Sequence, residues 1–235
     1  MILDLDEQIF PPFNGFPNEG IKFLERLKKN NNREWYAKHK QEYEELLKFP
    51  MQCFVNSLKP FFSEFAPQYD VHPKHSVFRI YRDVRFSKNK APYKTHIAAH
   101  FVMRGNPKGF LGSGYYMSIE PGEVFLGGGI YMPESGQLKK IRKAIDSRSK
   151  EFLEILTKKS FKKMFGAIEG KTLQRIPQGF TSDHPLAEYL KLKQFFVGVE
   201  LPETACFKKN FLNKAEEVFR EMSPFINFLN EALEQ

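Results

Sequence analysis

Apolar positions recur at helical spacing over the first part of the chain. They return every three or four residues from 19 to 29 and again from 33 to 48, which predicts two amphipathic helices. The three asparagines at 30–32 offer turn chemistry and a cap between these helices. A third helix is expected to start at Pro50, because proline is tolerated in the first helical turn. The pattern therefore predicts helices up to about residue 65.

The spacing changes to simple alternation after Pro67. From Val77 to Phe86 the even positions are mostly apolar and the odd ones mostly polar or charged, as in a strand with one buried face. A Pro-Gly pair at 121–122 is typical of a tight turn between two strands. Further strands are predicted over residues 95–103, 114–120 and 123–131. Sequential strands with short links predict an antiparallel meander.

Helical spacing returns from Gln137 to about Met164, and a loop rich in glycine and proline follows. A short helix is expected at 186–192, a late strand at 195–201, and a final helix from about Thr204 that is interrupted or restarted at Pro224. The predicted fold class is α+β: an antiparallel meander sheet, about residues 77–131 plus the late strand, packed against N-terminal and C-terminal helices. Without repeats or linkers, residues 1–235 are expected to form a single domain.

Charge changes this picture because it is concentrated in one place. The chain is 41% hydrophobic and 15% aromatic, which excludes a disordered protein, and its net charge is +8. Residues 72–108 hold nine basic side chains and a single acid, Asp83, so this segment alone accounts for the whole excess. The remaining residues carry 27 basic and 27 acidic side chains. Such a local excess is typical of a binding site for an anion.

Cysteine content and hydropathy favour a soluble, cytoplasmic protein. Cys53 and Cys206 are the only cysteines and cannot build a disulfide framework, which fits a reducing compartment. The first residues, MILDLDEQIF, are acidic and lack the basic start of a signal peptide. No apolar run approaches the ~18 residues that a membrane span needs, so no membrane partner is expected.

The strongest candidate site is RIYRDVRFSKNKAPYK, residues 79–94, and its surroundings. Arginine forks, lysines and aromatic rings together are suited to bind phosphate, carboxylate or nucleic acid. Arg82 falls on the apolar side of the predicted strand, so we expect it to have a buried acid partner. The expected ligand is an anionic small molecule or nucleic acid, and the predicted binding residues are Arg79, Tyr81, Arg82, Arg85, Lys88, Lys90, Tyr93, Lys94, His96 and His100.

Two other interpretations remain open. In the first, the protein is a non-catalytic scaffold in which Arg79, Arg82 and Arg85 are structural clamps to Asp83 and to glutamates of the N-terminal helices. In the second, His96, His100 and Glu120 serve a metal-dependent hydrolase. Two strand histidines four residues apart lie about 13 Å from each other, too far for one ion. Neither a metal site nor a cofactor is therefore predicted, and whether the protein is an enzyme stays open.

Two glycine motifs have structural explanations that we favour. The stretch GAIEGKT, residues 166–172, ends like a phosphate-binding loop, but its glycines are one residue too close and a helix precedes it. We expect an ordinary helix end there. Gly127, Gly128 and Gly129 interrupt an apolar strand, which allows a bulge or the close approach of another backbone or of a ligand.

Several long stretches carry a resemblance to a known family: FRIYRDVRFSKNKAPYKTH, YYMSIEPGEVFLGGGIYMPESGQLKKIR, HPLAEYLKLK, and the N-terminal FNGFP and NNREWYAKHKQEYEE. Together they resemble uncharacterised bacterial and fungal proteins known only as a domain of unknown function or conserved hypothetical proteins. One departure is Tyr131, where the family more commonly has tryptophan. The resemblance implies a single full-length domain with the basic segment at its centre, and it implies no activity, cofactor or catalytic residue.

Overall fold

A computed structural model describes residues 10–105 and 112–234; Lys108 of the basic segment and most of the MILDLDEQIF stretch lie outside them. The N-terminal part is helical, with α1 (Asn18–Lys29), α2 (Arg33–Tyr43), a π-helical turn η1 (Glu44–Lys48) and α3 (Phe49–Phe65). The Asn32 side chain caps α2 by accepting a hydrogen bond of 2.9 Å from the Trp35 backbone N–H, as expected.

The third helix begins at Phe49, one residue before the predicted start, and the backbone stays helical from Arg33 to Phe65. Pro50 lies in the first turn of α3, directly after the π-helical turn. A widened turn at this point suits a residue that has no backbone N–H to donate. The predicted helices are thus confirmed, but the second and third form one continuous helical stretch.

The sheet confirms the α+β prediction. Its strands are β1 (Tyr69–Asp70), β2 (Ile97–Met103), β3 (Gly114–Glu120), β4 (Glu123–Ile130) and β5 (Phe195–Pro202). They lie in chain order, and every neighbouring pair is antiparallel. The late strand β5 joins the edge of the meander beside β4, with Gly127 opposite Gly198. Alternation and the Pro-Gly turn were therefore sufficient to predict four of the five strands.

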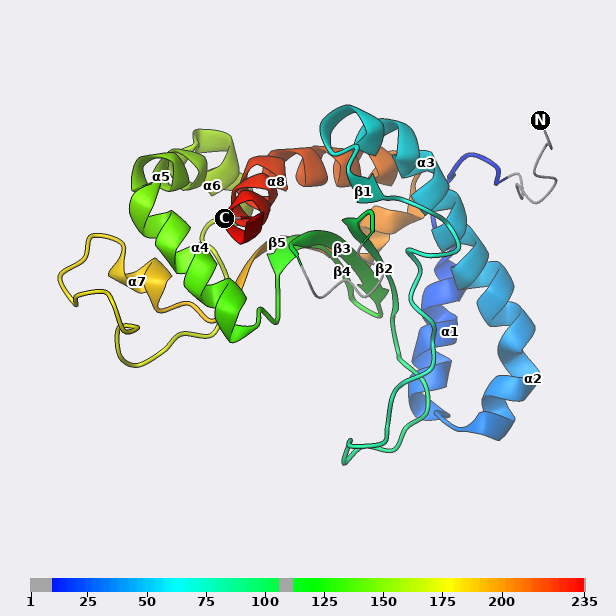
Figure 1. The fold of residues 1–235 in the computed structure, drawn as a ribbon. Helices are drawn as coiled ribbons and strands as arrows, with labels where there is room; N and C mark the ends of the chain where they lie inside the picture. Colours follow the sequence, from blue (N-terminus) through cyan, green and yellow to red (C-terminus); the bar gives the residue numbers. More distant parts are fainter. Residues whose placement is uncertain (1–9, 106–111, 235) are drawn as a thin grey trace.

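The predicted strand from Val77 to Phe86 is wrong. Only isolated bridges form there, Val77 with Ala99 and Tyr81 with Tyr93. Ile80 is buried as the alternation requires, but Phe86 is 95% exposed because the chain has left the core by then. Residues 77–95 instead make an irregular excursion, called the basic hairpin below, which extends away from the sheet beside α1 and α2 (Figure 1).

The helical structure predicted from 137 to 164 is confirmed, but it is divided. Three helices occupy this region: α4 (Ser135–Ser147), α5 (Ser149–Thr157) and α6 (Lys159–Phe165). Arg148 and Lys158 separate them, and both have backbone angles outside the helical region. The Arg148 guanidinium bonds Glu151 and Glu231 at 2.5 Å each, which holds the first break against the C-terminal helix.

The remaining elements are α7 (Ala187–Leu190), a 3-10 turn η2 (Glu203–Phe207) and α8 (Phe211–Glu234). The expected interruption at Pro224 does not occur, because α8 continues through it. Its buried face runs from Phe211 to Ala232, and packing of that face outweighs the lost hydrogen bond. None of the helices in the described residues is long and apolar enough to cross a membrane.

Helix α8 covers one face of the sheet, while the helices α1, α2, α4 and α7 flank it on either side (Figure 1). On the covered face, the Tyr115 ring packs against Phe62 of α3 and Phe219 of α8, with ring centroids 5.0 and 5.6 Å away. Asn230 of α8 accepts hydrogen bonds from the Ser113 backbone and hydroxyl and donates one to Tyr69. The opposite face is free of helices in the described part of the chain, as Figure 1 shows.

Candidate functional site

The uncovered side of the sheet, called the open face below, is the most extensive candidate surface. In β3, Tyr115, Met117 and Ile119 are buried toward α8, so Tyr116 and Ser118 point the other way. The strand register extends this alternation across the sheet. The open face therefore carries Ala98, His100, Gly114, Tyr116, Ser118, Glu120, Glu123, Phe125, Gly127, Gly129, Phe196, Gly198 and Glu200.

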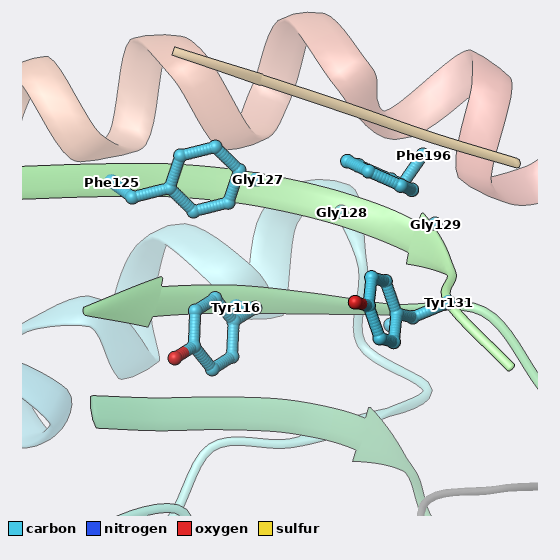
Figure 2. A pocket seen from close by; sticks show the side chains of 8 residues that line it. Tyr116, Phe125, Gly127, Gly128, Gly129, Tyr131 and Phe196 are labelled. Atoms are coloured by element: carbon cyan, nitrogen blue, oxygen red, sulfur yellow. The ribbon is translucent and has the colours of Figure 1, made fainter. Parts of the chain in front are cut away.

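A hollow of about 490 Å³ lies on this face, within the size range of small-molecule pockets. Figure 2 shows aromatic rings standing around a run of glycines on β4. The Tyr131 and Phe196 rings are 5.6 Å apart, and those of Tyr116 and Phe125 are 6.2 Å apart. We call this feature the aromatic hollow; it is lined by Gly114, Tyr116, Phe125, Gly127, Gly128, Gly129, Tyr131 and Phe196.

Missing side chains make the floor of the hollow flat. The ring of Phe125 lies so close to Gly198 that a Cβ atom there would be 2.3 Å from it. Gly129 has a φ of +135°, which favours glycine, and a Cβ atom there would come within 2.1 Å of the Phe195 carbonyl oxygen. The structural interpretation of the triple glycine is therefore supported at Gly129, and all three glycines also line the hollow.

A second hollow of about 220 Å³ continues from the first toward the basic hairpin. The two share Gly114, Tyr116, Gly129 and Tyr131, and the second adds Phe78 and His100. The Phe78 ring centroid is 4.3 Å from that of His100, and the Lys94 Nζ lies 4.6 Å from the Phe78 centroid. A cation stacked on an aromatic ring is thus placed beside the open face.

Burial sets the electrostatics of this edge. It lowers the pKa of Lys94, and the neighbouring Arg79 lowers that pKa further. Burial also lowers the pKa of His96 and of His100, and Lys94 adds to both effects. Both imidazoles are consequently neutral at physiological pH, and the positive charge at this edge comes from Lys94.

Carboxylates gather at the end of the sheet where β2 begins and β3 turns into β4. Glu120 and Glu123 are paired across the β3–β4 turn, and Glu200 lies opposite Phe125 on β5. Burial raises the pKa of Glu123, and repulsion from Glu200 and Glu120 adds to the rise. An anionic group on the open face is therefore favoured near Lys94 and disfavoured near the turn.

The ten residues predicted to bind an anion fall into three places. Lys94, His96 and His100 lie along the outer edge of the open face. Arg79 and Tyr81 line a separate cavity against α2, and Tyr93 packs behind it with its ring centroid 4.2 Å from that of Tyr36. The other four predicted residues, Arg82, Arg85, Lys88 and Lys90, belong to residues 82–91, called the hairpin tip.

No carboxylate of the described residues pairs with Arg82, so the acid partner expected for it is not found there. Arg82 is half-buried, and its guanidinium donates to the Ala91 carbonyl oxygen at 3.2 Å. Since the chain leaves the core at this point, a backbone oxygen across the tip is its nearest acceptor. Lys90 likewise donates to the Val84 carbonyl oxygen at 3.0 Å. Both side chains stabilise the tip of the hairpin.

The clamp interpretation finds little support. Among the described residues, the ion pair that the three arginines Arg79, Arg82 and Arg85 make is the one between Arg85 and Asp83, at 2.7 Å and in solvent. Arg85 holds the pKa of Asp83 at about 2. The basic hairpin is joined to the N-terminal helices by an amide instead: Asn31 donates to the Tyr93 carbonyl and accepts from its N–H, both at 3.0 Å.

The metal interpretation has no geometric basis in the described residues, which hold no group of three His, Cys, Asp or Glu side chains that could bind an ion. His96, His100 and Glu120 therefore do not form a ligand set. Cys53 and Cys206 are both buried, and burial raises the pKa of each thiol, to about 12 for Cys206. Neither is activated as a nucleophile.

Sequence reasoning missed the aromatic residues of the open face. Tyr116 and Phe125 occupy the polar-facing positions of their strands, where alternation leads one to expect hydrophilic side chains. That departure from the pattern, next to the triple glycine, is the signal that could have revealed them. Phe196 and Tyr131 complete the hollow from segments 65 residues apart in the chain.

The sequence was also compared with known proteins. A comparison with curated proteins finds no match to this chain. The model of one family, described as conserved hypothetical protein DUF2461, matches residues 19–228, which include every element described above except the start of α1 and the end of α8. The chain therefore belongs to the DUF2461 family of conserved hypothetical proteins.

Proposed function

We propose that the protein binds single-stranded nucleic acid across the open face of its sheet. The observation that supports this most is the aromatic hollow, where four rings surround a glycine floor beside a basic edge. Aromatic side chains on a sheet stack unpaired bases, and each stacked base contributes about 1–3 kcal/mol. Such stacking tolerates any base sequence, so it suits binding that is not sequence-specific.

The charge distribution supports the same ligand. Phosphates require cations next to the stacking surface. The basic hairpin supplies Lys94, stacked on Phe78 at the edge of the second hollow, and Lys88 at the hairpin tip. Glu120, Glu123 and Glu200 repel phosphates from the end of the sheet where β3 turns into β4. The phosphates of a bound strand are therefore expected to lie beside Lys94 and away from the three glutamates.

A strand fits better than a free nucleotide because the aromatic surface extends beyond one hollow. The second hollow adds the Phe78 ring, and the hairpin tip presents Phe86, which is 95% exposed. The Arg85 guanidinium lies 5.8 Å from the Phe86 centroid, so a cation accompanies this ring as well. A duplex would hide its base faces, which excludes stacking on these rings.

Fluorescence anisotropy with a labelled oligonucleotide of about ten bases, within the site sizes of single-strand binders, tests the proposal. We expect binding that weakens as salt rises, and weaker binding to a duplex of the same length and to a mononucleotide. The variant Lys88→Gln/Lys90→Gln should bind less tightly, whereas Lys162→Gln/Lys163→Gln on α6 removes the same charge and should not. Equal loss in both variants, or no binding at low salt, contradicts the proposal.

A further inference from the structure

A cavity of about 290 Å³ lies on the helical side of the basic hairpin, between residues 73–81 and the continuous helical stretch from α2 to α3. We call it the tyrosine cavity. It is distinct from the aromatic hollow, although Phe78 borders both it and the second hollow of the open face. The side chains that matter for its chemistry are Tyr36, Lys40, Tyr43, Lys48, Lys74 and Arg79.

Two of the residues that line this cavity are tyrosines whose hydroxyls face its interior without a bonded neighbour among the described residues. Tyr36 and Tyr43 are 3% and 4% exposed, yet neither hydroxyl hydrogen-bonds to another described residue. Buried tyrosine hydroxyls normally find a partner. Burial raises the pKa of both, and Glu44 adds to the rise, so each remains a protonated donor. Both hydroxyls can therefore donate to an acceptor bound in the cavity.

Cations outnumber carboxylates around these hydroxyls. Lys40 and Lys48 come from the helical wall, and Lys74 and Arg79 from the segment opposite. Glu44 is the one acid lining the cavity, and Lys48 bonds it at 2.6 Å. Three cations thus have no carboxylate inside the cavity, which gives it a net positive charge suited to an oxyanion.

The local backbone also favours a ligand site. Tyr36, Lys40, Glu44 and Lys48 follow one another at four-residue spacing, so they line a single side of the helical stretch. The π-helical turn Glu44–Lys48 forms part of this wall. Such turns are rare within helices and occur often at functional sites.

We propose that the tyrosine cavity binds the phosphate group of a small phosphorylated ligand. The hydroxyls of Tyr36 and Tyr43 donate to its oxygens, and Lys40, Lys74 and Arg79 balance its charge. The cavity volume leaves room for a phosphate with a small organic group and excludes a nucleic acid strand. This site is separate from the open face, so phosphate binding here can be tested independently of strand binding there.

Inorganic phosphate is the probe that tests the site. We expect millimolar phosphate to raise the melting temperature of the protein relative to chloride at equal ionic strength, and calorimetric titration to give one site per chain. The double variant Tyr36→Phe/Tyr43→Phe keeps both rings and loses both donors. It should weaken phosphate binding by about tenfold or more, since a hydrogen bond to a charged group contributes at least that much.

The control is Tyr131→Phe, which removes a hydroxyl from the aromatic hollow and should leave phosphate affinity unchanged. A second variant, Lys74→Gln, changes an exposed side chain and is expected to fold normally while also weakening phosphate. Stabilisation of the double variant by phosphate as strong as that of the unaltered protein overturns the inference. So does the absence of any phosphate-specific effect on the unaltered protein.

Discussion

The ring of Phe125 lies across the backbone of Gly127, so close that a Cβ atom on the glycine would be 2.5 Å from it. The two residues are on the same strand and the same face, two positions apart. Glycine at 127 therefore determines where the Phe125 ring rests, and with it the shape of the aromatic hollow.

Gly127→Ala should change the site more than the fold. The added methyl displaces the far end of a half-buried ring, which can swing toward solvent, so we expect a loss of stability of about 1 kcal/mol or less. The displaced ring then occupies part of the hollow in which a base would stack, so oligonucleotide affinity should fall. Denaturant unfolding and anisotropy measure the two effects separately; a variant with unchanged affinity would show that Phe125 does not stack on a base.

Gly128→Ala should reduce stability more than oligonucleotide affinity, because Gly128 faces the core. A Cβ atom there would be 2.6 Å from the Met222 Sδ and 2.9 Å from the Ile226 Cδ1, both on α8. Overpacking this contact should lower the free energy of unfolding by about 1–3 kcal/mol. Chemical denaturation checks the size of the loss, and replacing Met222 by alanine in the same chain should recover part of it. Equal stabilities of the two glycine variants would contradict the assignment of the faces.

The contrast between these neighbours shows how far the sequence could go. Alternation and the Pro-Gly turn are local signals, and they sufficed to predict β2, β3, β4 and β5 within two residues. The role of each glycine depends on α8, which follows about 80 residues later. No local pattern could have assigned one glycine to the core and the next to the open face.

The basic hairpin illustrates a second limit. Its alternating residues satisfied the strand pattern, but alternation does not reveal whether a partner strand is present along the whole length. The tyrosine cavity was equally hidden, because Tyr36 and Tyr43 come from α2 and Arg79 from the basic hairpin. The sequence indicated that residues 72–108 are strongly basic. The division of the ten predicted binding residues into three separate places follows from the tertiary arrangement.

Phe86→Ala tests whether the hairpin tip takes part in strand binding. The side chain is 95% exposed, so stability should change by no more than about 0.5 kcal/mol. Loss of one stacked base predicts a fall in oligonucleotide affinity of about 1–3 kcal/mol, while mononucleotide binding stays the same. Phe86→Trp provides the matched control, because it keeps a stacking ring and should retain affinity. If alanine and tryptophan bind alike, the ring is not a contact.

Stability is expected to depend on pH through the histidines of the open face. Burial first, and Lys94 second, lower the pKa of His96 and His100 below the ordinary value of 6.5. Below pH 6.5 the unfolded chain therefore binds protons that the folded protein does not. The stabilising contribution of the neutral imidazoles is complete above that pH and is lost as the pH falls toward the folded-state pKa values.

Denaturant unfolding between pH 7.5 and pH 5, at about constant ionic strength, measures this dependence. The free energy of unfolding should fall across the lower half of this range. His100→Gln removes one of the two titrating groups beside Phe78 and Lys94, so its curve should be shallower than that of the unaltered protein, and His96→Gln should behave similarly. His100→Gln with an equally steep loss would show that the imidazole at position 100 is protonated as readily in the folded protein as in the unfolded chain.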